Sequence, residues 1–169
     1  MEITRAGYWD VDGTAAARAN RRWWHDNAVD YLADHGEFLG DADFRWCPEG
    51  LREAEAQLLG DVAGADVVEI GAGAAQCSRY LLSRGARVLA TDVAEGMVAR
   101  SREIDARLGV SVPAVVADAR ALPLPDSSVD VAFTSFGALP FLPDAAAVHA
   151  EVARVLRPGG RWVFAVVHP

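Results

Sequence analysis

From residue 66 onward, the chain alternates short, continuously apolar runs with longer segments of helical periodicity. The apolar runs predict strands at residues 67–70, 87–91, 114–117, 129–134 and 161–167, and the helical segments are residues 76–83, 98–108 and 143–156. Strands that are apolar throughout are typical of a parallel sheet buried on both faces. With right-handed crossovers, this pattern predicts an α/β fold with an open, doubly wound parallel sheet.

The preceding segment, residues 1–65, is rich in aromatic residues and carries two stretches of helical periodicity, 14–34 and 49–59. We interpret it as a helical, aromatic cap segment, and residues 66–169 as the α/β core of one domain. Trp23 and Trp24 are expected to pack the cap helices onto the sheet. Alternatively, some of the aromatic residues of this segment could close over a ligand, namely Tyr8, Trp9, Trp24, Tyr31 and Trp46. Trp46 is the best candidate, because it precedes Cys47 and Pro48 in a predicted loop.

Composition and charge narrow the range of partners. The 169 residues carry 24 acidic and 16 basic side chains, a net charge of −8, which argues against a nucleic-acid or anionic membrane partner and favours a small molecule. The chain contains no lysine, which excludes Schiff-base catalysis and a Walker-type phosphate loop. Its two cysteines lack the spacing of a metal site, so we expect no metal and a reducing, cytoplasmic setting. No apolar run reaches the length of a membrane span.

A glycine-rich turn follows the first predicted strand and opens the next helix. Gly71 and Gly73 permit a tight turn in which the backbone can approach a ligand closely, and the helix N-terminus supplies free N–H groups. Glycine is also common in ordinary strand-to-helix turns, so the turn alone does not establish a ligand site.

Two carboxylates stand at the ends of the next two strands. Asp92 ends the second strand, where a carboxylate can accept both hydroxyl groups of a ribose. Asp118 ends the third strand, where it could accept a hydrogen bond from an exocyclic amine, or simply cap a turn. Because the carboxyl ends of parallel strands meet in one crevice, these residues together predict a nucleoside-binding site.

The type of nucleoside ligand is indicated by two other positions. A dinucleotide site reads Gly-x-Gly-x-x-Gly, but Gln76 stands where the third glycine belongs. Glu69 lies two residues before Gly71, where a carboxylate would face a diphosphate. An adenosine linked to a zwitterionic amino acid fits both features better, although an NAD-dependent oxidoreductase remains the alternative enzyme.

Four segments resemble the class I S-adenosylmethionine-dependent methyltransferases of the small-molecule type. They are residues 69–75 with their two glycines, residues 92–97, residues 116–119 and residues 155–160. The resemblance covers about residues 66–169 and implies a Rossmann-like sheet of order 3-2-1-4-5. It also implies S-adenosylmethionine as cofactor, S-adenosylhomocysteine as product, and methyl transfer to an unidentified acceptor.

The resemblance also implies roles for individual residues. Glu69 with the turn at Gly71 and Gly73 would contact the methionine part, Asp92 the ribose hydroxyls, and Met97 the adenine. The predicted cofactor-binding residues are Glu69, Gly71, Ala72, Gly73, Gln76, Asp92, Val93, Met97, Asp118, Ala119, Ser135, Phe136 and Trp46. Among these, Gln76 is our candidate for the methionine carboxylate. No catalytic residue is predicted: His168 could act as a general base, but we favour the interpretation that it ends the fifth strand before Pro169.

The sequence departs from this family in one respect, because it ends after the fifth predicted strand, before the usual strands six and seven. We therefore expect either a fragment of a longer protein or a protomer whose partner covers that strand. The fifth predicted strand is therefore an apolar edge, expected to seek a partner. A homo-oligomer formed through that edge follows as an expectation, as does the alternative of a non-catalytic cofactor-binding or interaction module.

Overall fold

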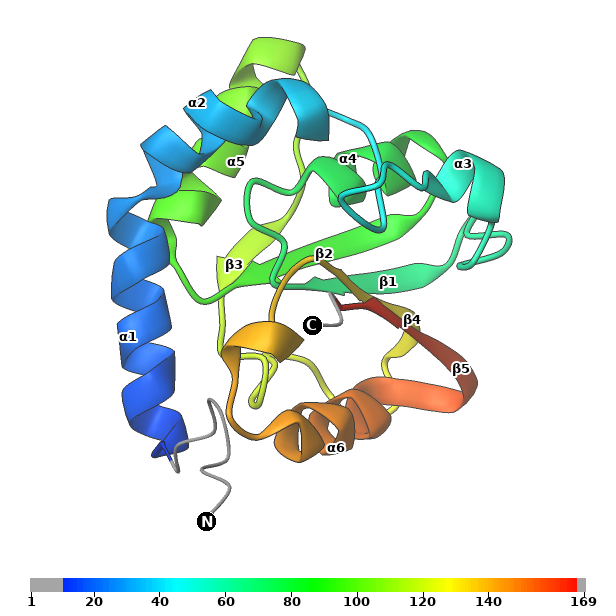
Figure 1. The fold of residues 1–169 in the computed structure, drawn as a ribbon. Helices are drawn as coiled ribbons and strands as arrows, with labels where there is room; N and C mark the ends of the chain where they lie inside the picture. The colour runs from blue at the N-terminus through cyan, green and yellow to red at the C-terminus, as the bar shows by residue number, and fades with distance from the viewer. Residues whose placement is uncertain (1–10, 167–169) are drawn as a thin grey trace, which may run out of the picture.

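The computed structural model describes residues 11–166, and a parallel five-stranded sheet forms its centre. The strand order is β3-β2-β1-β4-β5, as predicted. The strands are β1 (Asp66–Ile70), β2 (Arg87–Asp92), β3 (Ala114–Val116), β4 (Val129–Ser135) and β5 (Leu156–Ala165). In Figure 1, α4 (Gln76–Ser83) and α5 (Glu95–Leu108) lie on one face of the sheet, and α6 (Ala145–Val155) lies on the other.

Both faces of the sheet are buried because its strands are apolar at successive positions. On one face, Val67 of β1 belongs to a cluster that includes Phe133 and Leu81. On the other face, its neighbour Val68 packs in a cluster with Val148 of α6. This two-sided burial confirms the interpretation of the continuous apolar runs as strands of a doubly wound parallel sheet.

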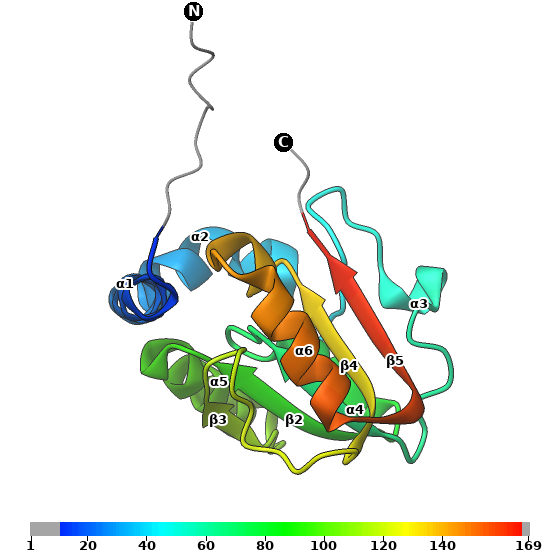
Figure 2. The same cartoon turned by 90° about the horizontal axis from the view of Figure 1, so that it is seen from below.

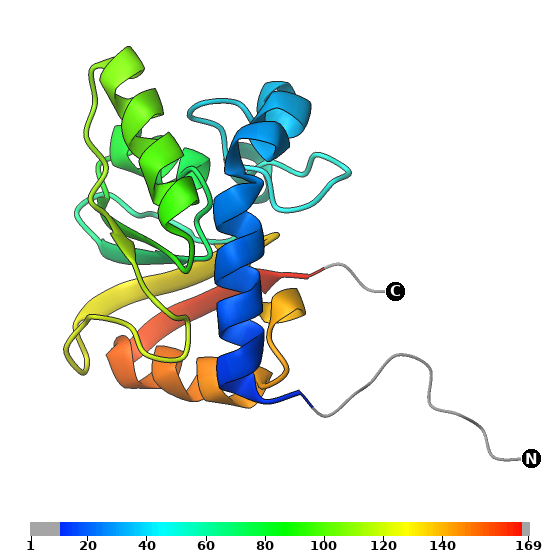
Figure 3. The ribbon, with the colours of Figure 1, turned by 90° about the vertical axis from the view of Figure 1, so that its left-hand side faces the viewer.

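Before the sheet, the chain forms two consecutive helices, α1 (Gly13–Asp26) and α2 (Ala28–Leu39), where one helix over residues 14–34 was predicted. The break occurs at Asn27, whose side-chain amide donates to the Trp23 carbonyl at 2.8 Å and so caps α1. Helix α2 then continues past Gly36 and ends at Gly40, whose φ of 69° stops it. Figure 3 shows α1 crossing the carboxyl ends of the strands, and Figures 2 and 3 show α2 continuing from it on the side of the sheet that carries α5.

The prediction of a helix over residues 49–59 is wrong, because the structure has only one helical turn there, α3 (Glu53–Ala56). The buried carboxylate of Glu53 accepts hydrogen bonds from the backbone N–H groups of Leu58 and Leu59, at 3.0 and 2.8 Å. The backbone at Gln57 adopts the left-handed conformation, so the chain turns into a loop. A side chain thus satisfies amides that a longer helix would have paired.

Strand β5 begins earlier than predicted, at Leu156, because residues 157–160 are accommodated as an irregularity in its pairing with β4. Among the described residues it forms one edge of the sheet, and Phe164 on it is 46% exposed. A short 3-10 helix, η1 (Leu139–Phe141), follows β4 at the carboxyl end of the sheet. Within residues 11–166, no helix has the length and apolar character needed to cross a membrane.

Candidate functional site

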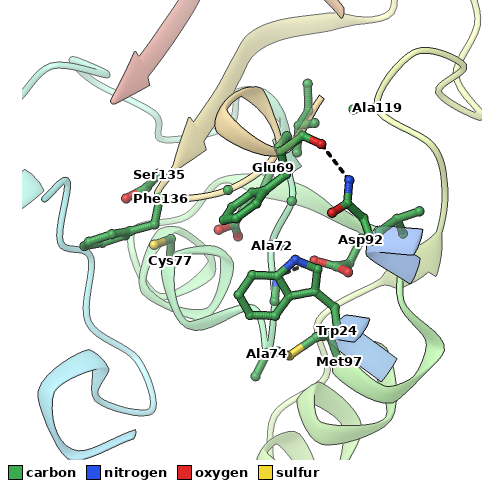
Figure 4. A pocket seen from close by; sticks show the side chains of 18 of the residues that line it. Trp24, Glu69, Ala72, Ala74, Cys77, Asp92, Met97, Ala119, Ser135 and Phe136 are labelled. Atoms are coloured by element: carbon green, nitrogen blue, oxygen red, sulfur yellow. Dashed lines mark hydrogen bonds between the residues drawn. The ribbon is translucent and has the colours of Figure 1, made fainter. Parts of the chain in front are cut away.

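A cavity of about 330 Å³ lies at the carboxyl end of the sheet, and α1 and α2 form part of its wall. Every predicted cofactor-binding residue except Trp46 lines it. Figure 4 shows Trp24, Asp92 and Met97 on one side of this cavity and Cys77, Ser135 and Phe136 on the other. The topology has therefore brought the ends of four strands and the cap segment together around one space.

The glycine turn between β1 and α4 uses its two glycines in different ways. Gly71 has a φ of 68°, and a Cβ atom there would lie 2.8 Å from the Ala138 backbone nitrogen, so only glycine lets these loops touch. Gly73 has a φ of 53°, and a Cβ atom there would meet no atom within 4 Å. Gly73 also lines the cavity, so its missing side chain leaves room beside the backbone for a ligand.

Asp92 stands at the end of β2 with its carboxylate fixed by two backbone amides. Gly73 N–H donates to Oδ2 at 2.8 Å, and Ala94 N–H donates to Oδ1 at 2.9 Å. Burial raises the pKa of Asp92 to about 6 despite these hydrogen bonds. Each carboxylate oxygen can accept a further hydrogen bond, so Asp92 can receive two donors from a ligand.

Glu69, at the end of β1, lies beneath the glycine turn with its side chain buried. Its Oε2 accepts hydrogen bonds from the Ser78 N–H and hydroxyl at 2.9 and 2.5 Å. Burial raises the pKa of Glu69 to about 7, and the Ser78 hydrogen bonds oppose that rise. The carboxylate thus caps the first turn of α4 from the preceding strand, and Glu69 also lines the cavity.

The β2 and β3 side of the cavity combines apolar and polar groups. Met97 of α5 is buried with Ala94, and Val93 and Trp24 pack against them. Asp118 is paired with Arg120: Oδ1 accepts from the Arg120 N–H at 2.9 Å, and Oδ2 lies 2.7 Å from Nη2. This ion pair lowers the pKa of Asp118. The turn-capping interpretation of Asp118 is therefore correct, and its carboxylate also borders the cavity.

The loop after β4 completes the opposite wall. Ser135 donates its hydroxyl to the Arg45 carbonyl at 2.5 Å, which attaches β4 to the cap segment. Phe136 and Ala138 have φ values of 63° and 51°, a conformation that costs side-chain-bearing residues about 1 kcal/mol or more. Backbone strain of this kind is typical of loops that line binding sites.

Trp46 is the one predicted cofactor residue that the structure places elsewhere. It is 2% exposed and packs on Phe44 and Phe133 in the hydrophobic core. Its indole N–H donates to Oε2 of the buried Glu53 at 2.8 Å. The loop prediction for residues 44–48 is correct, since the segment has only an isolated bridge at Arg45 before bends and a turn. The error concerned the direction of the side chain, because burial alternates along this loop and turns Phe44 and Trp46 inward.

Comparison with known proteins identifies the family. Residues 68–164 match the model of the "Methyltransferase domain" family, which is more than half of the chain. The chain belongs to the methyltransferase domain family. The match begins in β1 and ends in β5, so it includes every strand that contributes to the cavity.

Individual relatives give the same family but different acceptors. The methyltransferase domain is 38% identical over 112 residues to demethylmenaquinone methyltransferase of a Mycobacterium species, covering 66% of this chain and 46% of the relative. It is 34% identical over 121 residues to malonyl-[acyl-carrier protein] O-methyltransferase of Serratia marcescens, covering 69% and 45%. The crystal structure of an S-adenosylmethionine-dependent methyltransferase from Mesorhizobium loti has 35% identity and a TM-score of 0.58, covering 66% and 50%. The chain spans about half the length of the curated relatives.

Several residues that line the cavity of the methyltransferase domain were not among the predicted cofactor residues, including Asn20, Trp24 and Arg45 of the cap segment. Trp24 lines the cavity while also packing against the Met97 cluster, whereas Trp23 is 53% exposed and contributes no core packing. Asn20 of α1 donates its amide to the Phe141 carbonyl at 2.6 Å. Arg45 is the basic residue among the described lining residues. The buried Phe44 and Trp46 on either side of Arg45 were the available signal, because alternation turns the residue between them the other way.

Proposed function

We propose that this methyltransferase domain binds S-adenosylmethionine in the cavity and transfers its methyl group to a small-molecule acceptor. The observation that carries the proposal is Asp92, a buried carboxylate at the end of β2 with one accepting position open on each oxygen. Two adjacent ribose hydroxyls are the donors that match this arrangement. Membership of the methyltransferase domain family supports the same cofactor.

The donor chemistry belongs to the cofactor, whose sulfonium supplies the methyl group when it is bound. The residues of the chain bind and orient. Asp92 would accept the ribose hydroxyls, Met97 would pack on the adenine, and Glu69 would face the ammonium of the methionine part. Holding donor and acceptor in line at near-attack distance contributes at most about 7–11 kcal/mol, so a nucleophilic side chain is not needed.

Arg45, rather than Gln76, is our candidate for the methionine carboxylate. The other charged residues that line the described cavity are Asp43, Glu69, Asp92 and Asp118, all of them acids. Asp43 offsets the Arg45 charge only partly, since its Oδ2 lies 3.2 Å from Arg45 and 3.3 Å from Arg52. A guanidinium can bind a carboxylate through two parallel hydrogen bonds, which the neutral Gln76 amide cannot do.

A nicotinamide dinucleotide fits this site poorly. In dinucleotide sites, the diphosphate lies at the N-terminus of the helix after the glycine turn. Here the Glu69 carboxylate already accepts the Ser78 N–H at that helix N-terminus. A diphosphate would therefore approach a carboxylate rather than free amides, and Gln76 adds a side chain where the third glycine is required.

The remaining wall of the cavity favours an uncharged, largely apolar acceptor. It is formed by Trp24, Phe136, Phe141 and Leu142, and Asn20 adds one amide to this group. The Asn20 amide nitrogen is engaged by the Phe141 carbonyl, which leaves its oxygen to accept from an acceptor hydroxyl. A hydroxylated ring fits this wall better than a charged chain. The two named relatives suggest a naphthohydroquinone and a malonyl thioester as the first acceptors to compare.

Calorimetric titration with S-adenosylmethionine, S-adenosylhomocysteine and NADH tests the proposed cofactor. We expect micromolar binding of the first two, about −8 kcal/mol, and none of NADH. Asp92→Asn should weaken binding about 30-fold by removing the charge from two hydrogen bonds, while the exposed Asp34→Asn on α2 serves as the matched control. Binding of NADH alone, or an unchanged affinity in Asp92→Asn, would overturn the proposal.

The Arg45 assignment has its own test. Methylthioadenosine carries the nucleoside but lacks the amino acid, so Arg45→Met should weaken S-adenosylhomocysteine and leave methylthioadenosine unaffected. If Arg45→Met weakened the affinity for both ligands equally, Arg45 would have a structural role and would not bind the methionine carboxylate.

Transfer of a radiolabelled methyl group to the two acceptors tests turnover. We expect transfer to the naphthohydroquinone. Cofactor binding without transfer to either acceptor would favour the non-catalytic module.

Association through the edge of β5 belongs to the same proposal. Phe164 is half-exposed there and packs near Trp162 and His149 on the surface. We propose that two copies pair along this edge at residues 162–165, because this end of β5 is apolar and uncharged and such an edge readily adds another strand. Light scattering should give a dimer mass that Phe164→Lys reduces to a monomer mass. A monomer at all concentrations in the wild type would reject the pairing.

A further inference from the structure

The guanidinium of Arg79 is a buried charge that the proposed methyl transfer does not use. Arg79 lies on α4, and its side chain is 1% exposed. It forms an ion pair with Asp105 of α5, with Nη1 2.9 Å from Oδ1. Burying two charges costs stability unless the geometry satisfies them. A contribution to stability alone therefore does not explain why this ion pair is buried here.

The other donors of Arg79 bind two segments that border the cavity. Its Nη2 donates to the Ala74 carbonyl in the glycine turn, and its Nε donates to the Asp41 carbonyl at 2.6 Å. Asp41 lies just before the cavity residues 43 and 45, while α5 carries Met97 near its start. One planar side chain thus connects the glycine turn, α5 and the cap segment.

The glycine turn has a specific need for such an anchor. Ala75 follows Ala74 with a φ of 60°, a left-handed conformation that costs an alanine about 1 kcal/mol or more. The Arg79 hydrogen bond holds the carbonyl side of the Ala74–Ala75 peptide. The same turn aims the Gly73 N–H at Asp92. Any relaxation at Ala75 would move the backbone that is proposed to approach the cofactor.

We infer that Arg79 is a positioning residue, which fixes the glycine turn in its binding conformation before the cofactor arrives. This inference rests on the proposed function for the identity of the cofactor. A loop held in its bound conformation loses less entropy on binding, so the affinity is higher. Lysine cannot replace arginine here. The planar guanidinium donates to acceptors on three sides, whereas a compact ammonium cannot reach all three.

The experiment compares three variants for affinity and for local order. Arg79→Lys keeps the charge opposite Asp105 but cannot keep all three anchors. Asp105→Asn weakens the ion pair and leaves the Ala74 contact. Adding Ala75→Gly to Arg79→Lys removes the left-handed strain, because glycine adopts this conformation freely. Affinity for S-adenosylhomocysteine is measured by calorimetry, and order in the turn by hydrogen exchange of amides 72–77 without ligand, at a temperature where circular dichroism shows each variant folded.

We expect Arg79→Lys to raise the Kd about tenfold, the loss of roughly one buried hydrogen bond to a charged group, and to accelerate exchange in the turn. Asp105→Asn should change the Kd less than about twofold although it lowers the melting temperature. Ala75→Gly should restore most of the affinity of Arg79→Lys. Wild-type affinity in Arg79→Lys would overturn the inference, as would a loss in Asp105→Asn that equals it. If the wild type binds no S-adenosylhomocysteine, the proposed function fails, and exchange in the turn still decides whether Arg79 holds it.

Discussion

The raised pKa of Asp92 makes a prediction about how cofactor binding depends on pH. Burial raises this pKa to about 6, and only the ionised carboxylate can accept two ribose hydroxyls at once. If the ionised form alone binds, the Kd is multiplied by about 1 + 10^(6 − pH). This factor is close to one at pH 7.5 and about 11 at pH 5, so we expect affinity to fall about tenfold between these values.

Methylthioadenosine is the appropriate ligand for this measurement. Glu69, with a pKa of about 7, also titrates in this range and is proposed to face an ammonium. Methylthioadenosine retains the ribose hydroxyls and lacks that ammonium, so its pH dependence isolates Asp92. Calorimetric titrations from pH 5 to pH 8 should therefore show one transition near pH 6 in the wild type. In Asp92→Asn, the affinity should be weak throughout and flat across that transition.

Ionisation of Asp92 should lower the stability of the folded state, although it favours ligand binding. Because the pKa of Asp92 is higher in the folded chain than its usual value of 3.8, the folded state binds more protons between about pH 4 and pH 6. The contribution of Asp92 to stability therefore falls as the pH rises through this window. In Asp92→Asn the amide nitrogen would face one of the two backbone N–H donors, so the variant is destabilised, but its free energy of unfolding relative to the wild type should rise by about 2 kcal/mol between pH 4 and pH 7.5. Flat methylthioadenosine affinity in the wild type from pH 8 to pH 5, together with a stability difference between Asp92→Asn and the wild type that does not change between pH 4 and pH 7.5, would refute the reasoning.

Three further predictions concern single residues of the site and of the core. Gly71→Ala should lower the free energy of unfolding by about 2–3 kcal/mol in urea melts, because its Cβ atom would lie 2.8 Å from the Ala138 nitrogen; a loss below 1 kcal/mol would contradict the loop contact. Gly73→Ala should cost only about 1 kcal/mol of stability but weaken S-adenosylhomocysteine at least about tenfold, with unchanged affinity as the contrary result. Trp46→Phe should destabilise by about 2–3 kcal/mol without changing the Kd, whereas Trp24→Phe should abolish the ligand-induced change in tryptophan fluorescence; the reverse pattern would restore the sequence-based assignment.

The part of the site that lies at the ends of the strands could be predicted from the sequence for a physical reason. In a parallel sheet, the strands are apolar without interruption, so their ends are visible as the first glycine or acid after each run. Gly71, Asp92 and Asp118 are such positions, and the topology requires that they meet at one edge. The roles of their side chains were less visible. Nothing local to Glu69 indicates that it caps α4 through Ser78, nine residues further on.

The cap segment could not be predicted to the same degree because its contacts are distant in sequence. Gly96 on α5 permits α1 to approach so closely that a Cβ atom there would lie 2.6 Å from the His25 carbonyl oxygen. Arg21 of α1 is paired with Glu95 of α5. Helical periodicity identifies the face of α1 that is apolar, but not which part of the sheet that face covers. The prediction for Trp46 failed because nothing in the sequence shows that its indole N–H pairs with the buried carboxylate of Glu53, the first residue of α3.

This division bears on how cofactor and acceptor are recognised. The residues proposed for the cofactor lie at strand ends and in the glycine turn, where backbone conformation fixes them and where relatives with different named acceptors match the chain. The wall assigned to the acceptor comes instead from α1 and from the segment around η1, which are joined by the Asn20 hydrogen bond and by the edge-on contact of Trp24 with Phe141. No residue of α1 is fully buried, so substitutions on its inner face cost little stability. The cofactor site is part of the sheet, whereas the acceptor wall lies on a helix with little buried surface, so the two can vary independently. For this reason we expect the choice of acceptor to depend on Asn20, Trp24 and Phe141.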